Sequence, residues 1–299
     1  MSAGSLATSA THTVMDELHF ARVQTNGISL NVAQAGTESG PLVILLHGFP
    51  EFWFGWKKHI PALAAAGCRV WAPDQRGYNT SDKPPNVGDY SLDTLAADAV
   101  GLIDAAGRER AVLVGHDWGA AVAWWVANNY PERLDKLVII NVPHPLVMRR
   151  VMRTSLRQLM RSWYIFLIQV PGLPEWISRR NNWHDLVQGM KTSSLPGAFS
   201  DADFDEYRRA WSQPEAYTAM LNWYRAMFRY GARRPKHERI STPTLILWGR
   251  RDKFIGPEGA ELSLAMCDRG TLAMFDENTH WLQHERPGEV CGRVIEFCQ

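Results

Sequence analysis

Residues 112–121 read VLVGHDWGAA. An apolar run typical of a buried strand leads into a Gly-x-Asp-x-Gly pattern, and a helix is predicted to follow. Small residues on both sides of Asp117 fit a sharp turn between strand and helix, which holds the central residue in a strained conformation and exposes its side chain. The N-terminus of the following helix would favour a negative charge on Asp117. We therefore expect Asp117 at the carboxyl end of a central strand, facing a functional site.

Short apolar runs recur on both sides of this turn. A two-stranded hairpin is predicted over residues 19–32, with its tight turn at Asn26-Gly27. Other runs that indicate buried strands span 42–46, 68–72, 111–114, 137–140, 244–247 and 271–275. Between two of these runs, apolar residues recur at helical spacing. Ser91 is placed to cap the N-terminus of this predicted helix, and Gly107 lies just past its C-terminus. This alternation predicts an α/β fold with a mostly parallel central sheet flanked by helices.

The alternation stops between about residues 142 and 240. This segment is rich in Arg and Trp, and it has helical patterns at 147–160 and 215–228. Because strands resume at about residue 243, the segment is predicted to be a helical cap inserted into the α/β domain. The predicted organisation is an N-terminal tail over residues 1–16, a core over 17–142 and 239–299, and a helical cap (lid) over 143–238.

Composition excludes several classes of protein. The chain has 299 residues, and 32 Lys and Arg against 31 Asp and Glu give a net charge of +1. This balance argues against a nucleic-acid-binding protein, which needs a basic excess to contact phosphates. No apolar stretch approaches the roughly 20 residues that cross a bilayer, and the N-terminus does not resemble a signal peptide, so the expected location is cytoplasmic. The four cysteines lack metal-binding spacing and are expected to be free thiols.

Three further motifs follow predicted strands. The loop 47–51 contains Phe49, whose N–H, together with that of Trp118, could form an oxyanion hole. Asp252 follows the run 244–247, and His280 follows the run 271–275. Side chains at the carboxyl ends of parallel strands gather at one edge of the sheet, and the chain order of nucleophile, acid and histidine is that of α/β-hydrolases.

On these motifs the sequence resembles the α/β-hydrolase superfamily and, within it, the epoxide hydrolases. The likeness extends from about residue 20 to residue 299. Its motifs are His-Gly-Phe-Pro-Glu at 47–51, Tyr-Asn-Thr-Ser-Asp-Lys-Pro at 78–84, Gly-His-Asp-Trp-Gly at 115–119 and Asn-Val-Pro-His-Pro at 141–145. The resemblance implies that Asp117 is the nucleophile, Asp252 the acid and His280 the base. We expect no metal and no cofactor.

An aspartate nucleophile favours attack on a saturated carbon, because attack on an ester or amide would give a high-energy anhydride. The alkyl ester formed would then be hydrolysed by water that His280 activates. The resemblance also implies two cap tyrosines, and Tyr164 and Tyr224 stand in the matching contexts YIFLIQVPG and LNWYR. These would hydrogen-bond the epoxide oxygen and donate a proton to it. The expected reactants are a small lipophilic epoxide and water.

Two alternatives stay open. Haloalkane and haloacetate dehalogenases use the same nucleophile. Haloalkane dehalogenases also tend to have Trp directly after it, as Trp118 is here, but their halide-binding Asn would stand where this chain has Phe49. Haloacetate dehalogenases commonly have a carboxylate-binding Arg at the position of Trp118. A non-catalytic binding module on the hydrolase fold is the second alternative, since fold alone does not fix function. The expected pocket residues are Phe49, Trp118, Trp223 and His47, and His47 is also expected to hold its loop by hydrogen bonds. The oligomeric state, monomer or homodimer, stays open.

Overall fold

The computed structural model of this chain describes residues 18–231 and 233–299, so the predicted tail over residues 1–16 lies outside the described residues. An eight-stranded sheet forms its centre, in the order β1-β2-β4-β3-β5-β6-β7-β8. β1 and β2 form the predicted antiparallel hairpin, β2 pairs antiparallel with β4, and the remaining neighbours are parallel. The strands are β1 (His19–Thr25), β2 (Ile28–Ala35), β3 (Leu42–Leu46), β4 (Arg69–Pro73), β5 (Ala111–His116), β6 (Leu134–Ile140), β7 (Thr244–Gly249) and β8 (Gly270–Phe275). The predicted α/β fold is confirmed, with small differences at the strand ends.

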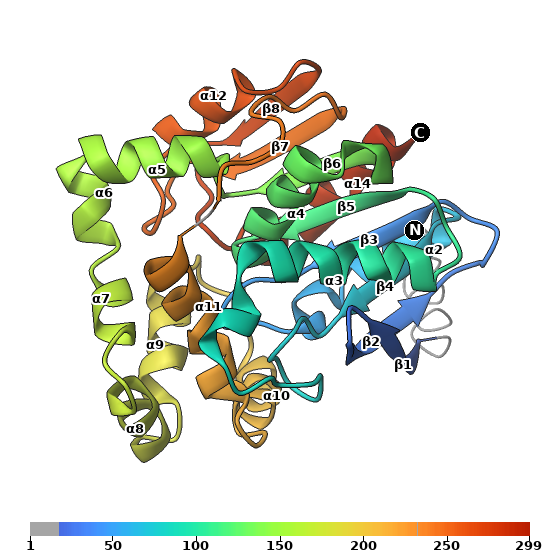
Figure 1. Cartoon of the computed structure of the whole chain (residues 1–299). Helices are drawn as coiled ribbons and strands as arrows, with labels where there is room; N and C mark the ends of the chain where they lie inside the picture. The colour runs from blue at the N-terminus through green and yellow to red at the C-terminus, as the bar shows by residue number, and fades with distance from the viewer. Residues whose placement is uncertain (1–17, 232) are drawn as a thin grey trace, which may run out of the picture.

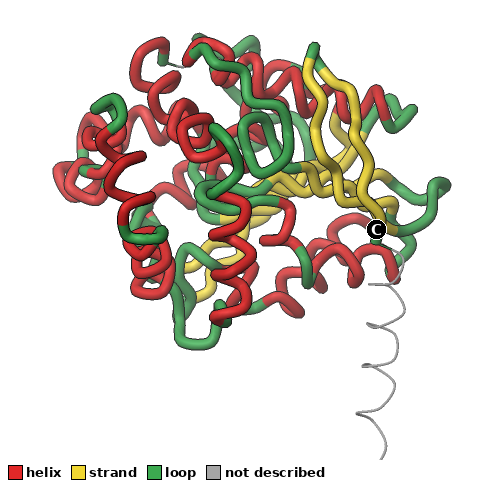
Figure 2. The backbone as a smooth tube through the Cα atoms, turned by 90° about the horizontal axis from the view of Figure 1, so that it is seen from below, coloured by secondary structure: helices red, strands yellow, loops and turns green. Residues whose placement is uncertain are grey.

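Helices cover both faces of the sheet (Figures 1 and 2). In β5, Leu113 belongs to the apolar cluster under α3 (Leu92–Ala105) and α4 (Trp118–Asn129). Its neighbour Val112 belongs to the opposite cluster, under α2 (His59–Ala65) and α14 (Pro287–Cys298). Because alternate side chains of a strand point to opposite faces, a strand covered on both faces appears in the sequence as a continuous apolar run. The shorter elements of the core are η1 (Trp53–Trp56), η2 (Val87–Tyr90), η3 (Pro131–Arg133), α12 (Glu258–Leu264) and α13 (Leu282–Glu285).

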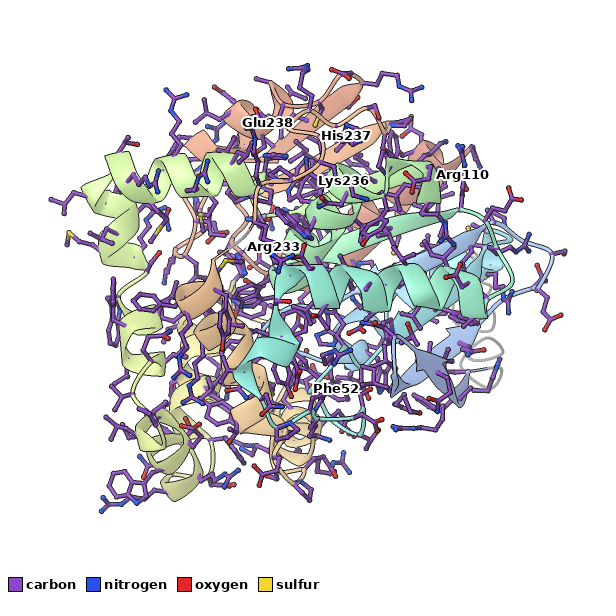
Figure 3. The ribbon with its side chains drawn as sticks, in the orientation of Figure 1. Phe52, Arg110, Arg233, Lys236, His237 and Glu238 are labelled. Atoms are coloured by element: carbon purple, nitrogen blue, oxygen red, sulfur yellow. The ribbon has the colours of Figure 1, made fainter. Side chains whose placement is uncertain are left out.

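In the described part of the chain, seven helices lie between β6 and β7, and they gather at one end of the sheet (Figure 1). They are α5 (Pro145–Thr154), α6 (Leu156–Arg161), α7 (Tyr164–Ile168), α8 (Leu173–Arg180), α9 (His184–Ser193), α10 (Asp201–Trp211) and α11 (Ala216–Tyr230). Trp211 donates a 2.6 Å hydrogen bond to the carbonyl oxygen of Pro50, in the loop that follows β3. Phe52 of the same loop packs edge to face on Tyr207 of α10, with ring centroids 5.6 Å apart (Figure 3). The inserted helices therefore cover the carboxyl ends of the strands.

One predicted helix differs from the structure. The pattern at 147–160 forms two helices, α5 and α6, because Ser155 between them is extended at φ −114 and ψ 105. The Ser155 side chain accepts a 3.2 Å hydrogen bond from the N–H of Gln158, so a good N-cap residue starts a new helix in the middle of an apolar pattern. The four predicted free thiols are confirmed. Among the described residues, no helix combines the length and the apolar character that crossing a membrane requires.

Candidate active site

Asp117 occupies the turn between β5 and α4 with φ 49 and ψ −123. Residues with a side chain rarely adopt this conformation, and where it occurs it stores strain. A Cβ atom on Gly119 would lie 2.1 Å from the backbone oxygen of Leu46. Only glycine therefore lets the first turn of α4 lie this close to the end of β3. The strained turn expected at Asp117 is present in the structure.

The loop after β3 holds one oxygen of the Asp117 carboxylate. The N–H of Phe49 donates a 2.7 Å hydrogen bond to Oδ1. Gly48 permits this approach, because a Cβ atom there would lie 2.2 Å from Cβ of Asp117. Trp118 is the first residue of α4, so its N–H is among those that have no carbonyl partner within the helix. Both predicted oxyanion-hole residues thus lie next to the carboxylate.

His280 lies on the other side of the Asp117 carboxylate, in the loop after β8. Its Nε2 is 3.5 Å from Oδ2 of Asp117, and its Nδ1 is 2.7 Å from Oδ2 of Asp252. Asp252 follows β7 and is 2% exposed. The fold therefore brings three side chains from distant parts of the chain into one line of polar contacts.

The charges of these groups support one another. Burial alone would lower the pKa of His280, but the carboxylates of Asp252 and Asp117 outweigh it and raise this pKa to about 10. Burial alone would raise the pKa of Asp117, but the hydrogen bond and charge of His280 outweigh it and lower this pKa below the ordinary value. At neutral pH the site therefore holds an ionised carboxylate beside an imidazolium.

Two tyrosines of the inserted helices face this carboxylate. Tyr164 begins α7 and Tyr224 lies in α11, and their ring centroids are 6.0 Å apart. Tyr224 also packs edge to face on Phe49, with centroids 5.3 Å apart. Burial and the negative charge of Asp117 raise the pKa of both phenols above the ordinary value. Both hydroxyl groups therefore stay protonated and can donate hydrogen bonds.

A cavity of about 910 Å³ connects these groups. Asp117, His280, Tyr164, Tyr224 and Phe49 all contribute to its wall. Most of the remaining lining is apolar and includes Leu167, Ile168, Leu186, Met190 and Trp281. Such a volume accommodates a small organic molecule. Within residues 18–231 and 233–299, no three His, Cys, Asp or Glu side chains are arranged to hold a metal ion.

Known proteins are similar to this chain in sequence and in fold. The profile of the α/β hydrolase fold family matches residues 41–287. The AB hydrolase superfamily protein YfhM of Bacillus subtilis is 46% identical over 284 residues, which cover 95% of this chain and 99% of that protein. Epoxide hydrolase 4 of Mus musculus is 36% identical over 285 residues, which cover 93% of this chain and 78% of that protein. The chain belongs to the epoxide hydrolases of the α/β-hydrolase family. Among solved structures, the epoxide hydrolase of Bacillus megaterium in complex with an inhibitor superimposes on this chain with a TM-score of 0.84. Its sequence is 30% identical, and the match covers 93% of this chain and 99% of that chain.

Asn141 is a residue of this hydrolase whose position sequence reasoning missed. It follows β6 with φ 57, and its Nδ2 donates a 2.9 Å hydrogen bond to Oδ2 of Asp252. Its Oδ1 accepts a 3.0 Å hydrogen bond from the N–H of Gly249. Asn is among the few residue types that tolerate a positive φ. The sequence signal was the Asn directly after a buried strand, within a motif to which no role was assigned.

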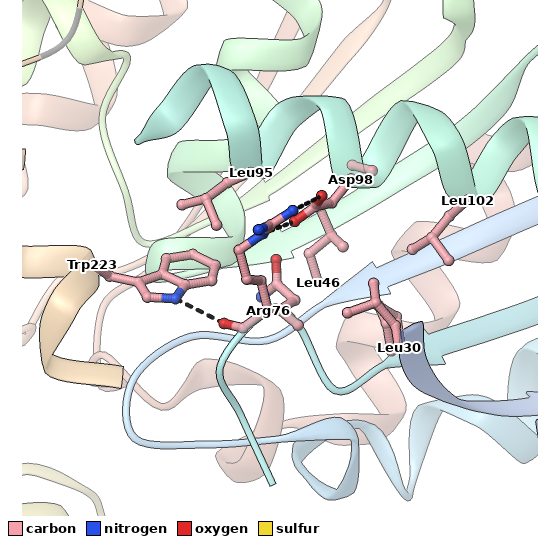
Figure 4. A pocket seen from close by; sticks show the side chains of 10 residues that line it. Leu30, Leu46, Arg76, Leu95, Asp98, Leu102 and Trp223 are labelled. Atoms are coloured by element: carbon pink, nitrogen blue, oxygen red, sulfur yellow. Dashed lines mark hydrogen bonds and ion pairs between the residues drawn. The ribbon is translucent and has the colours of Figure 1, made fainter. Parts of the chain in front are cut away.

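Two predicted pocket tryptophans do not line the cavity of this hydrolase. Trp118 packs edge to face on Tyr224, with ring centroids 4.9 Å apart, and is not part of the cavity wall. Trp223 donates a 2.9 Å hydrogen bond to the carbonyl oxygen of Arg76, beside the buried ion pair of Arg76 with Asp98 (Figure 4). Consecutive helix residues point in different directions, and here Trp223 points to Arg76 while Tyr224 lines the cavity. The structure corrects the predicted pocket at these two positions.

His47 lies outside the cavity lining as well. It is fully buried, and its Nε2 accepts a 3.0 Å hydrogen bond from the N–H of Gln75 in the loop after β4. The His47 carbonyl oxygen accepts a second hydrogen bond, from the Gln75 side chain. Burial lowers the pKa of His47 to about 4, so the ring is neutral. His47 therefore joins two loops, as predicted, and the structure corrects its assignment to the pocket wall.

A buried polar cluster behind Asp117 was also missed. Glu51 is 2% exposed, and its Oε1 accepts a hydrogen bond of 2.7 Å from the Tyr207 hydroxyl and one of 2.6 Å from Nε2 of His284. Burial alone would raise the pKa of Glu51, but His284 and His116 hold it well below the ordinary value. Nε2 of His116 in turn lies 2.9 Å from the carbonyl oxygen of His280. The cluster therefore connects an inserted helix to the loop that carries the histidine.

Proposed function

We propose that this chain hydrolyses a small lipophilic epoxide to a vicinal diol through a covalent ester on Asp117. The observation that carries the proposal is that Asp117 shares the wall of one cavity with Tyr164, Tyr224 and His280. A nucleophile, two proton donors and a base thereby surround the same space. The names of the relatives, which include several epoxide hydrolases, agree with it.

In the first step, Oδ2 of Asp117 attacks a ring carbon of the epoxide. The N–H of Phe49 holds Oδ1, whereas Oδ2 has only the longer 3.5 Å contact with Nε2 of His280. The carbon–oxygen bond of the ring breaks and an alkyl ester forms. The epoxide oxygen takes a proton from Tyr164 or Tyr224, whose raised pKa keeps it protonated until the ring opens.

His280 then changes its role. In the free enzyme the two carboxylates keep it charged, and esterification removes the charge of Asp117, so the pKa of His280 falls. Its proton restores the tyrosine, and the neutral Nε2 becomes a base. Nε2 takes a proton from water, and the hydroxide attacks the ester carbonyl carbon. The negative charge that develops on Oδ1 faces the N–H groups of Phe49 and Trp118.

Collapse of this intermediate breaks the acyl–oxygen bond. The leaving alkoxide takes the proton of the new carboxylic acid and departs as the diol, which returns Asp117 to the carboxylate. His280 keeps the proton that it took from water and is again the imidazolium. Asp252 orients His280 through the 2.7 Å contact to Nδ1 and stabilises its cationic form. Oδ2 of Asp117 leaves in the diol and the oxygen of water replaces it on Asp117, so the atoms balance over one turnover.

In this proposal the core and the cap supply different catalytic groups. A core over residues 17–142 and 239–299 supplies the nucleophile, the base and the acid, and a cap over residues 143–238 supplies both tyrosines. Such a cap limits the access of bulk water to the reacting groups and lets proton donors approach from the side opposite the nucleophile.

The test is diol formation from racemic styrene oxide by the purified protein. Turnover to diol in the wild type, and its loss in Asp117→Asn, would support the proposal. Chloroalkanes and haloacetate are run in parallel, because a dehalogenase would release halide from them. Halide release without diol would overturn the roles of Tyr164 and Tyr224, and normal folding without turnover of any of these substrates would count against the proposed reaction.

A further inference from the structure

The outermost inserted helices carry an extensive apolar surface. Of the twelve large hydrophobic side chains that are exposed in the described part of the chain, eight lie within residues 156–176. We call the six most exposed of these eight the cap patch: Leu156, Met160, Trp163, Phe166, Val170 and Trp176. Their exposed fractions run from 43% to 73%. The patch residues lie in and between helices α6, α7 and α8, which form the left edge of the molecule in Figure 1, away from the sheet.

The same segment is strongly basic. Residues 145–180 contain seven Arg and one Glu, a net charge of 7 − 1 = +6 in a chain whose total is +1. The one acid, Glu175, is buried in an ion pair with Arg225 of α11. The arginines are Arg149, Arg150, Arg153, Arg157, Arg161, Arg179 and Arg180, and none of them forms an ion pair with another described residue. The segment that carries the cap patch therefore also carries seven cations that form no ion pair with an acidic group of the described chain, and two of them, Arg157 and Arg161, line the cavity together with Met160 and Trp163.

The cavity of the candidate active site opens through this surface. Met160 and Trp163 line the cavity, although they are 67% and 64% exposed. Arg157 and Arg161 line it beside them. A molecule that enters between these side chains passes directly from the cap patch toward Asp117.

We propose that the cap patch docks this protein on an anionic phospholipid surface. Exposed Trp and Phe side chains enter the boundary between headgroups and acyl chains, and arginines around them contact the lipid phosphates. A lipophilic substrate dissolved in the lipid would then enter the cavity without crossing water. A second copy of the chain fits this surface poorly, because a two-fold contact would bring two sets of seven arginines together.

The test measures co-sedimentation with vesicles of phosphatidylglycerol and phosphatidylcholine, and with vesicles of phosphatidylcholine alone. Two variants change residues outside the cavity lining. One removes charge, with Arg149→Gln, Arg150→Gln and Arg153→Gln, and the other removes apolar area, with Phe166→Ser and Trp176→Ser. The matched control, Arg110→Gln, Arg269→Gln and Arg293→Gln, removes three exposed charges elsewhere, and Figure 3 shows Arg110 far from the inserted helices at the left of the view.

We expect the wild type and the control to bind the anionic vesicles and to bind phosphatidylcholine far more weakly. Binding should weaken about fivefold for each arginine removed and also fall in the Phe166→Ser, Trp176→Ser variant. Wild-type protein that stays in the supernatant in low-salt buffer would overturn the proposal. So would a stable dimer in light scattering that this apolar variant converts to a monomer. The Asp117→Asn variant should bind vesicles like the wild type, so a failure of docking is distinct from a failure of the proposed reaction.

Discussion

Replacing Asp252 by Asn tests how the fold prepares His280. The Asp252 carboxylate accepts hydrogen bonds of 2.7 Å from Nδ1 of His280 and 2.9 Å from Nδ2 of Asn141 on one oxygen. Its other oxygen accepts bonds of 2.7 and 2.9 Å from the N–H groups of Phe254 and Ile255. An Asn side chain has one accepting oxygen and a donating amide. In either orientation, the amide nitrogen of Asp252→Asn therefore meets two donors.

The size of the effect follows from these contacts. Two buried donors left without an acceptor cost about 1–3 kcal/mol each, so we expect a stability loss of about 2–6 kcal/mol. His280 loses the largest of the contributions that raise its pKa, and it loses the partner that orients its ring. Removing the equivalent carboxylate in a Ser-His-Asp enzyme lowers kcat about 10⁴-fold, or about 5.4 kcal/mol in the barrier.

The assay follows diol formation together with the mass of the intact protein after an acid quench. His280 acts mainly in the hydrolysis of the ester, so the variant should accumulate a protein adduct of the mass of the substrate. Asp276→Asn is the control, because Asp276 is an exposed acid near the same loops. Its kcat should equal that of the wild type, and no adduct should accumulate. A kcat for Asp252→Asn within tenfold of the wild type, or the absence of an adduct, would refute the reasoning.

Three further predictions concern the same site. The Tyr164→Phe, Tyr224→Phe double variant should lower kcat/KM for diol formation by about 10²–10⁴-fold, because both proton donors are lost. The control, Tyr230→Phe at an exposed position, should leave kcat/KM unchanged. Equal kcat/KM values for the two variants would contradict the acid role of Tyr164 and Tyr224. Asn141→Ala should lower the free energy of unfolding in urea by about 2–4 kcal/mol, because two buried hydrogen bonds are lost and Ala must adopt φ 57. A loss below about 1 kcal/mol would contradict the structural role of these two hydrogen bonds. Because the folded state raises the pKa of His280 from 6.5 to about 10, its stabilising contribution is complete below pH 6.5 and lost as the pH rises through about 10. The Tm of the wild type should therefore fall more steeply between pH 7 and pH 10 than that of His280→Gln, and parallel curves would contradict the assigned charge of His280.

The sequence predicts the strands and the turn at Asp117 because their causes are local. β5 is buried on both faces and therefore appears as a continuous apolar run, and the turn needs small residues at adjacent positions such as Gly119. The break in the predicted helix at Ser155 was less visible, because the apolar pattern continues through it. A side-chain cap there outweighs the pattern.

The corrected and missed residues depend on contacts that no local pattern reveals. Asn141 and Asp252 are 111 residues apart, and Glu51 and His284 are 233 residues apart. Trp223 and its neighbour Tyr224 have similar character in the sequence, and the packing of α11 decides which of them faces the cavity. Residue types could therefore be predicted, but the direction of each side chain required the tertiary structure.

The covalent ester on Asp117 is the central claim, and transfer of heavy oxygen from labelled water tests it most directly. In a single turnover with enzyme in excess, the account predicts an unlabelled diol and one labelled oxygen in the protein. The label should lie on Asp117 in the tryptic peptide of residues 111–133, located by fragment masses. Label in the diol of the first turnover, with none on Asp117, would mean direct attack by water and would contradict the account.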